Sequence, residues 1–174
     1  MDEGHAAIVG VVVRWLTDVG WEVQPEVTFA VYSERGSIDV LAWDAASRTL
    51  LVVEVKTELA SVEETLRRHD VKARLAHRVA AERFGWHAAR TARLLVLPDT
   101  SMARRRVARH AAVLERAYPV RGTDARRWIR APRVAIAGLV FVSDRTVRRS
   151  VGRKRIRVRR SGAACGGSAA GPAR

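Results

Sequence analysis

Hydrophobic and polar positions along the chain alternate between two spacings, which together predict a mixed α/β domain. Apolar residues at three- and four-residue spacing predict helices over 5–19, 58–84, 101–117 and 124–129. Short runs rich in apolar and β-branched residues predict strands over 21–30, 37–42, 50–55, 92–97 and 134–142. The helix over 58–84 stands between two strands, so we expect it to be a crossover that joins them in parallel.

Helix and strand ends carry residues that fit these boundaries. Asp2 can cap the first helix and Gly20 can end it. Pro25 lacks a backbone donor, so the strand over 21–30 is expected to lie at a sheet edge or to be irregular at its start. Ser61 and Glu64 form a capping box at the start of the long helix.

The stretch from Gly36 to Thr57 predicts an antiparallel hairpin, because turn residues separate its two apolar strands. If Asp44 and Thr49 close the loop, Asp39 faces Glu54 across the ladder. Side chains alternate between the faces of a strand. Polar side chains are then expected on one face, at Asp39, Glu54 and Lys56, and apolar ones on the other, at Ile38, Val40, Val53 and Val55.

Two facing carboxylates repel each other unless a cation lies between them. Mg²⁺ suits such a pair, because one or two carboxylates leave it positions for water and phosphate oxygens. Lys56 can then orient a metal-bound water and stabilise charge on a phosphate. These residue types predict metal-assisted phosphodiester hydrolysis at Asp39, Glu54 and Lys56. The alternative is an ion pair between Asp39 and Lys56 with no chemical role.

Lysine is rare in this chain, which adds to the interest of Lys56. Lysine occurs only at positions 56, 72 and 154, whereas the other basic residues are all arginine. A lysine beside Glu54 therefore indicates that a compact, titratable ammonium is needed there.

Asp39, followed after a hairpin by Glu54-Val55-Lys56, resembles the motif of the PD-(D/E)XK nuclease superfamily, which includes restriction-endonuclease-like and Holliday-resolvase-like members. The resemblance covers about residues 5–143. It implies an α/β fold with a restriction-endonuclease-like αβββαβ core, in which helices flank a mixed central sheet. It also implies Mg²⁺ (or Mn²⁺) held by Asp39 and Glu54, and a catalytic Lys56. Ile38 stands where the name-giving proline would be.

Four further groups are candidates for the same site. Many members of the superfamily carry an acid on the first helix, and positions 6–17 here hold none. Glu26 is the first substitute and Glu34 the second, with a solvent-exposed strand charge as the alternative for Glu26. Lys72 is expected on the helix side nearest the metal, with a solvated surface lysine as the alternative. The backbone carbonyl of Val55 can complete the metal site.

Charge predicts a polyanionic partner. The formal net charge is +14, distributed as −6 over residues 1–60, +11 over 61–143 and +9 over 144–174. The acidic part holds the predicted metal site, and the later elements are expected to hold DNA. RNA stays open, because phosphate contacts are alike for both. We interpret residues 1–143 as the nuclease-like domain and 144–174 as a disordered basic tail that binds phosphate backbones.

Other residues narrow the function classes. The single Cys165 permits no disulfide or cysteine zinc site within one chain, and the five histidines lack metal-ligand spacing. Residues 6–13 are too short for a membrane span, so a cytoplasmic protein is expected. The leading hypothesis is a Mg²⁺-dependent endo- or exonuclease, in which a homodimer is possible. The alternative is a catalytically weak or inactive nuclease-fold module that binds nucleic acid or regulates.

Overall fold

The computed structural model describes residues 3–143, and helices and strands follow one another in it largely as the apolar pattern predicts. The elements are α1 (Glu3–Asp18), β1 (Glu22–Val31), β2 (Glu34–Asp44), β3 (Thr49–Val55), α2 (Val62–Phe84), β4 (Arg90–Pro98), α3 (Ser101–Arg109), α4 (Ala111–Ala117), β5 (Val120–Arg121), α5 (Gly122–Arg130) and β6 (Ala137–Val142). The first six follow the order αβββαβ, which was expected.

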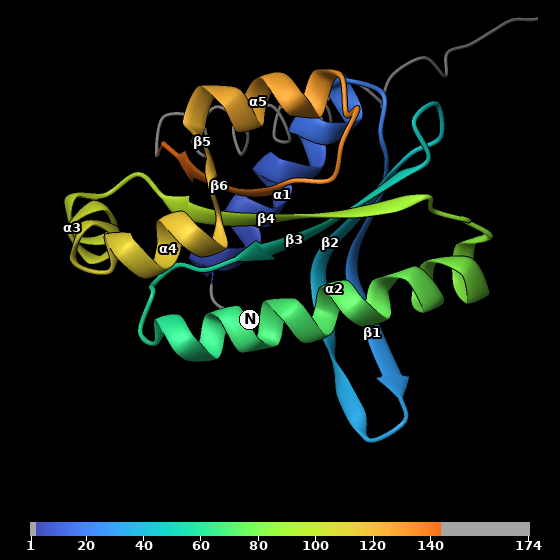
Figure 1. Cartoon of the computed structure of the whole chain (residues 1–174), viewed down its shortest axis with the longest axis horizontal. Coiled ribbons are helices and arrows are strands. Elements are labelled where there is room, and N and C mark those ends of the chain that lie inside the picture. The colour runs from blue at the N-terminus through green and yellow to red at the C-terminus, as the bar shows by residue number, and fades with distance from the viewer. Residues whose placement is uncertain (1–2, 144–174) are drawn as a thin grey trace, which may run out of the picture.

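One mixed sheet of six strands organises the molecule, in the order β1-β2-β3-β4-β6-β5 (Figure 1). The first three strands are antiparallel neighbours, whereas β3, β4, β6 and β5 run parallel. The strand that contains Pro25 lies at an edge, as predicted. Helix α2 joins the parallel strands β3 and β4, which confirms the predicted crossover. The fold class is therefore a mixed α/β sheet flanked by helices.

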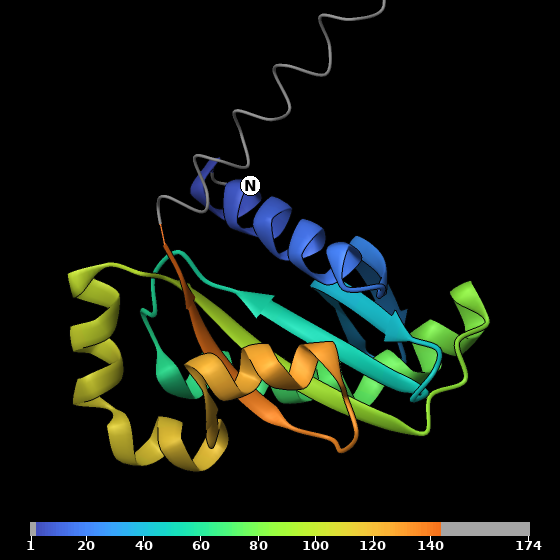
Figure 2. The same ribbon diagram turned by 90° about the horizontal axis from the view of Figure 1, so that it is seen from above.

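Helices cover both faces of the sheet, and the two views show α1 and α5 on one face and α2 on the other (Figures 1 and 2). We call these the α1 face and the α2 face. On the α1 face a single apolar cluster joins both helices to the sheet and includes Val12, Leu16, Val53, Val96 and Ile129. This continuous apolar layer joins one face of the sheet to α1 and α5.

The α2 face carries two separate apolar clusters instead of one. The first packs α2 against β1, β2 and β3 and includes Leu41, Val52 and Val79. The second packs the start of α2 and α4 against β4 and β6, and it includes Leu95 and Leu114. The seam between these clusters passes the end of β3, where the polar residues of the sequence motif lie.

The predicted hairpin register is confirmed where the ladder forms, from Val40 opposite Val53 to Asp44 opposite Thr49. The predicted face of Ile38 is wrong. Ile38 packs in the α2-side cluster with Val52, whereas Val40, two residues later, packs on the α1 side. The alternation breaks opposite Glu26, whose positive φ of 53° interrupts β1. Beyond that point the end of the β1–β2 hairpin presents its apolar residues to α2.

Predicted boundaries also needed correction in the second half of the chain. The helix expected over 101–117 is two helices that meet at His110, where φ and ψ are −110° and 28°. Val107 and Leu114 lie two helical turns apart and pack in the same cluster, so apolar spacing gave no sign of the break. The short strand β5 was not predicted, and β6 begins at Ala137 rather than at 134.

Two predictions lie outside the described residues, namely the cap by Asp2 and the basic tail over 144–174. Within residues 3–143, no helix combines the length and apolar character that crossing a bilayer requires.

Candidate active site

Asp39 and Glu54 come from neighbouring strands at the end of the β2–β3 ladder. Asp39 is one step beyond the last ladder pair, and its Oδ2 accepts a hydrogen bond of 2.6 Å from the backbone N–H of Val55. This side chain therefore ties β2 to β3 where the backbone ladder stops. Glu54 is fully buried and Asp39 is 8% exposed. Carboxylates so far from water require charged or hydrogen-bonding partners.

Two lysines supply these partners from different elements. Lys56 leaves the end of β3, where its backbone N–H donates to the carbonyl of Val96, and its Nζ lies 2.8 Å from Glu54 Oε1. Lys72 reaches over from α2, with its Nζ 2.5 Å from Glu54 Oε2 and 3.5 Å from Asp39 Oδ1. Lys72 is thus in the site, on the side where the sequence placed it. We call these four residues the charged cluster.

The cluster sets the protonation of its carboxylates in opposite directions. Burial and the negative charge of Glu54 raise the pKa of Asp39 above its ordinary value, against the opposing effect of Lys72. Burial also opposes ionisation of Glu54, but Lys72 and Lys56 outweigh it and hold the pKa of Glu54 below its ordinary value. Glu54 is therefore the firmly ionised member of the pair, and Asp39 is the member that takes up a proton first.

His69 lies one turn before Lys72 and is fully buried beneath the cluster. Its Nε2 is 3.1 Å from the carbonyl of Val52, which can only accept, so Nε2 carries the proton. Nδ1 then accepts a 2.7 Å hydrogen bond from the hydroxyl of Tyr118. Burial lowers the pKa of His69 to about 4, so the ring is neutral at pH 7. His69 thus fixes α2 to β3 two residues before Glu54.

We did not predict this role, because the spacing of the five histidines argued only against a metal site. A sequence signal was nevertheless present. Position 69 follows buried Thr65 by one turn and precedes buried Ala76 by two, so it belongs to the inward stripe of the helix. A histidine in such a stripe needs a polar partner inside the protein.

The two acidic candidates on the first hairpin are not members of the charged cluster. Glu26 occupies the position of β1 opposite Asp39, but its side chain is 38% exposed and its Oε1 lies 4.0 Å from Nε2 of His5 in α1. The charge of His5 has a small effect, which lowers the pKa of Asp39. Glu34 pairs with Val31 at the far end of the hairpin. The structure therefore brings together Asp39, Glu54, Lys56 and Lys72, with Glu26 beside them and Glu34 apart.

The donor chemistry of the cluster fits Mg²⁺ or Mn²⁺. Asp39 and Glu54 offer hard oxygen atoms that converge on one point, the place of the Lys72 ammonium. Mg²⁺ is commonly held by one or two carboxylates together with water and substrate oxygens. Among residues 3–143 no group of three or more His, Cys, Asp or Glu side chains gathers as a metal site. The predicted use of the Val55 carbonyl stays a prediction.

The chain matches no protein-family model and no curated protein in sequence. In structure it is similar to a repair endonuclease from Pyrococcus abyssi, with a TM-score of 0.35 and 16% identity over 64% of this chain. It spans 44% of that endonuclease, which is less than half its length. It is also similar to an XisH family protein from Nostoc punctiforme PCC 73102, with a TM-score of 0.33 and 16% identity over 60% of this chain and 85% of that one. Likeness at this level concerns the fold alone.

Proposed function

We propose that this protein is a metal-dependent phosphodiester hydrolase that acts on DNA. One observation carries the proposal. Two buried carboxylates from adjacent strands, Asp39 and Glu54, converge with the ammonium groups of Lys56 and Lys72 at the end of β3. An apolar strand end has no structural need for four charges, whereas phosphodiester hydrolysis needs oxygen ligands and cations together.

Each residue has a distinct part in the proposed chemistry. Asp39 and Glu54 would hold Mg²⁺ or Mn²⁺, and Val55 would add its carbonyl oxygen. When bound, the ion supplies Lewis acidity and makes water a stronger nucleophile at neutral pH. Lys56 is more exposed than Lys72, at 32% against 12% of the side chain, so Lys56 is the lysine that can meet substrate and orient the attacking water. Lys72 keeps Glu54 ionised.

DNA is the proposed substrate because of the positive charge of the later part of the chain. The net charge over residues 61–143 is +11, and the excess is almost entirely arginine. Arginine binds phosphate through a planar fork of donors, which suits a phosphodiester backbone. The same chemistry binds RNA, so the test below includes an RNA strand of matched sequence.

The test is cleavage of plasmid, single-stranded DNA and single-stranded RNA with Mg²⁺, Mn²⁺ or EDTA. Asp39→Asn, Glu54→Gln and Lys56→Met change the proposed machinery with little change in size. We expect metal-dependent cutting that each substitution lowers by about 10²–10³-fold. Glu63→Gln is the matched control, because Glu63 is an exposed acid in the first turn of α2. Cutting that survives Glu54→Gln and Lys56→Met contradicts the assignment.

One observation favours a second function, that of a nucleic-acid-binding module without chemistry. Lys72 places an ammonium between the two carboxylates, so the cluster is already neutralised from within. Such a site does not need a divalent ion to balance the charge of its carboxylates. DNA binding with steep salt dependence, together with no cleavage under any of the tested ions, would favour the binding module.

A further inference from the structure

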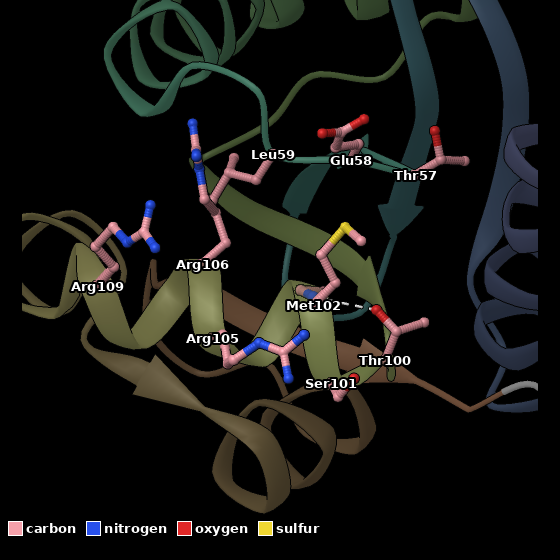
Figure 3. Close-up of a pocket in the computed structure, with 10 residues that line it drawn as sticks. Thr57, Glu58, Leu59, Thr100, Ser101, Met102, Arg105, Arg106 and Arg109 are labelled. Carbon is pink, nitrogen blue, oxygen red and sulfur yellow. Dashed lines mark hydrogen bonds between the residues drawn. The ribbon is translucent and has the colours of Figure 1, made fainter.

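A second feature lies directly beyond the charged cluster along the chain. A pocket of about 700 Å³ opens between the loop that follows β3, at residues 57–59, and the first two turns of α3 (Figure 3). Ligand pockets in proteins commonly enclose about 300–1,000 Å³, so there is room for a ligand of nucleotide size. The pocket also lies beyond the carboxyl ends of the parallel strands β3 and β4, where open α/β sheets usually bind ligands.

Three arginines of α3 line the pocket, and they differ in their partners. Arg106 donates from Nη2 to the carbonyl of Ala60, which fastens α3 to the loop after β3. Arg105 and Arg109 are exposed along the same wall. The neighbouring Arg104 is not in the lining, because it pairs with Asp99 at 2.6 Å and lies over the ring of Phe141. Arg105 and Arg109 are therefore the cations that can meet a ligand.

The rest of the pocket lining is not suited to phosphate alone. Met102 adds apolar surface and is 64% exposed, which is unusual for so large an apolar side chain, whereas Leu59 is only 2% exposed. Figure 3 shows Met102 pointing from α3 toward the loop that carries Glu58. The carboxylate of Glu58 repels phosphate at that rim, so a bound phosphate belongs on the arginine wall. A ligand with a charged end and a flat apolar end fits both parts.

The pocket continues the charged cluster without a break in the chain. Thr57 lines the pocket and directly follows Lys56, which contacts Glu54. A strand of nucleic acid bound at the cluster can therefore extend into the pocket. A base stacked in a duplex has both faces covered, whereas an unpaired base can leave the stack and contact a side chain.

We propose that this pocket binds an unpaired nucleotide of the nucleic-acid strand next to the cleaved phosphodiester, with its phosphate on Arg105 and Arg109 and its base against Met102. This assignment rests on the proposed function for the identity of the scissile bond, but binding in the pocket requires neither metal nor cleavage. The substrate class is single-stranded nucleic acid, or the frayed end of a duplex. The pocket therefore distinguishes single-stranded from double-stranded nucleic acid and does not read the base sequence.

The experiment measures binding of a fluorescent 12-nucleotide single strand by the full chain in EDTA, so that cleavage plays no part. The double variant R105A/R109A is compared with the control R74A/R130A, which removes the same charge from exposed positions on α2 and α5. We expect R105A/R109A to weaken binding at least tenfold more than the control does. Its slope of log affinity against log salt is expected to fall by about 0.7, which is the counterion release at the one phosphate that the two arginines bind.

Four further measurements complete the test. A blunt duplex of the same sequence is expected to lose no more than twofold in R105A/R109A relative to the control, and M102A is expected to weaken only the single strand. Equal losses in R105A/R109A and R74A/R130A overturn the proposal, because diffuse charge then holds the strand. A mononucleotide that binds as tightly as the 12-nucleotide strand also overturns it. Cleavage by Glu54→Gln separates the two proposals. Glu54→Gln that still cuts contradicts only the proposed chemistry, as long as the strand binds in the pocket. Glu54→Gln that loses cleavage while binding of the strand does not depend on Arg105 and Arg109 contradicts only the pocket.

Discussion

The two faces of the sheet are packed differently, although the same strands form both. On the α1 face one continuous apolar cluster packs two helices, whereas on the α2 face a seam of polar residues separates two clusters. The residues of this seam are buried and polar, namely Asp39, Glu54, Thr65 and His69. Each occupies a position that an apolar side chain would fill in an ordinary core. The difference shows that one layer stabilises the fold so that the other can hold charge.

Burying charged groups such as Asp39 and Glu54 has a large desolvation cost, which their attraction to the lysines only partly offsets. In the charged cluster each carboxylate has at least one ammonium within 3.5 Å. Removing a single partner should therefore have a larger effect than removing an apolar side chain of similar size. The predictions below compare the faces in this way, from the largest expected effect to the smallest.

Lys72→Met should cause the largest loss. It leaves Asp39 and Glu54 facing each other with one ammonium fewer, and removing one member of a buried ion pair commonly costs about 3–5 kcal/mol. Urea unfolding in EDTA at pH 8 measures the loss. The pKa of the carboxylates rises in the variant, so the native state binds protons more readily than the unfolded state. The deficit is then largest at high pH and shrinks as the pH falls toward 4.

Arg74→Met is the control for this substitution, because Arg74 lies on the same helix and is exposed. We expect it to change stability by less than about 0.5 kcal/mol. A deficit in Lys72→Met that is the same at pH 8 and at pH 5 would show that lost packing, rather than unbalanced charge, causes it.

A matched pair of leucines compares the faces directly. Leu16 is buried on the α1 face, and Leu75 is buried on the α2 face one turn after Lys72. Each truncation to alanine should destabilise the protein by about 3 kcal/mol, because each leaves a cavity. Only Leu75→Ala should also lower cleavage per folded molecule, since α2 positions Lys72. An equal loss of cleavage in both variants would contradict a special role of the α2 face in positioning Lys72.

Acid should weaken the fold through His69. Burial lowers the pKa of His69 to about 4, below the ordinary value of 6.5, so the unfolded chain binds the proton more readily between those values. Stability is therefore lost as the pH falls from 6.5 to 4, by about 3 kcal/mol from this group. His69→Gln, which keeps a donor for the Val52 carbonyl, should flatten the pH profile of unfolding in that window. His87→Gln, at an exposed position, should leave the slope unchanged.

Tyr118→Phe should have the smallest effect of the series. It removes the hydroxyl that donates to Nδ1 of His69 and leaves that nitrogen without this partner. A hydrogen bond of this kind contributes about 1 kcal/mol, which thermal unfolding can measure. Burial raises the pKa of the Tyr118 hydroxyl, so the variant should behave alike at pH 7 and pH 9. A loss that grows over that range would contradict the assignment of the hydroxyl as a neutral donor.

The sequence was sufficient to predict the centre of the fold, because local rules determine it. Alternation of apolar residues and the turn chemistry of Asp44 and Ser47 predict the hairpin register, and Asp44 indeed accepts from both the N–H and the hydroxyl of Ser47. The capping box is confirmed in part, since Ser61 Oγ accepts from the Glu64 N–H. Helical phase placed Lys72 on the side of α2 that faces Asp39 and Glu54. These features involve neighbours along one strand or one helix.

The features that the sequence did not reveal depend on contacts between distant segments. Ile38 changes face because β1 is interrupted at Glu26, and alternation within one strand cannot show a break imposed by its neighbour. The burial of His69 against Tyr118 depends on how the end of α4 meets α2. The helix break at His110 has no sign in the apolar spacing. The roles of Glu26 and of the Val55 carbonyl stay predictions.

The charged cluster comes from one uninterrupted stretch, residues 39–72, which forms a strand, a hairpin partner and the first half of a helix. Contacts between residues close in sequence form faster than contacts between distant ones, because they close shorter loops. The four charges can therefore meet during synthesis before β4 and β6 exist to cover them. We expect folding to begin at this polar seam. Strands β4 and β6 are then expected to cover the four charges after these have paired.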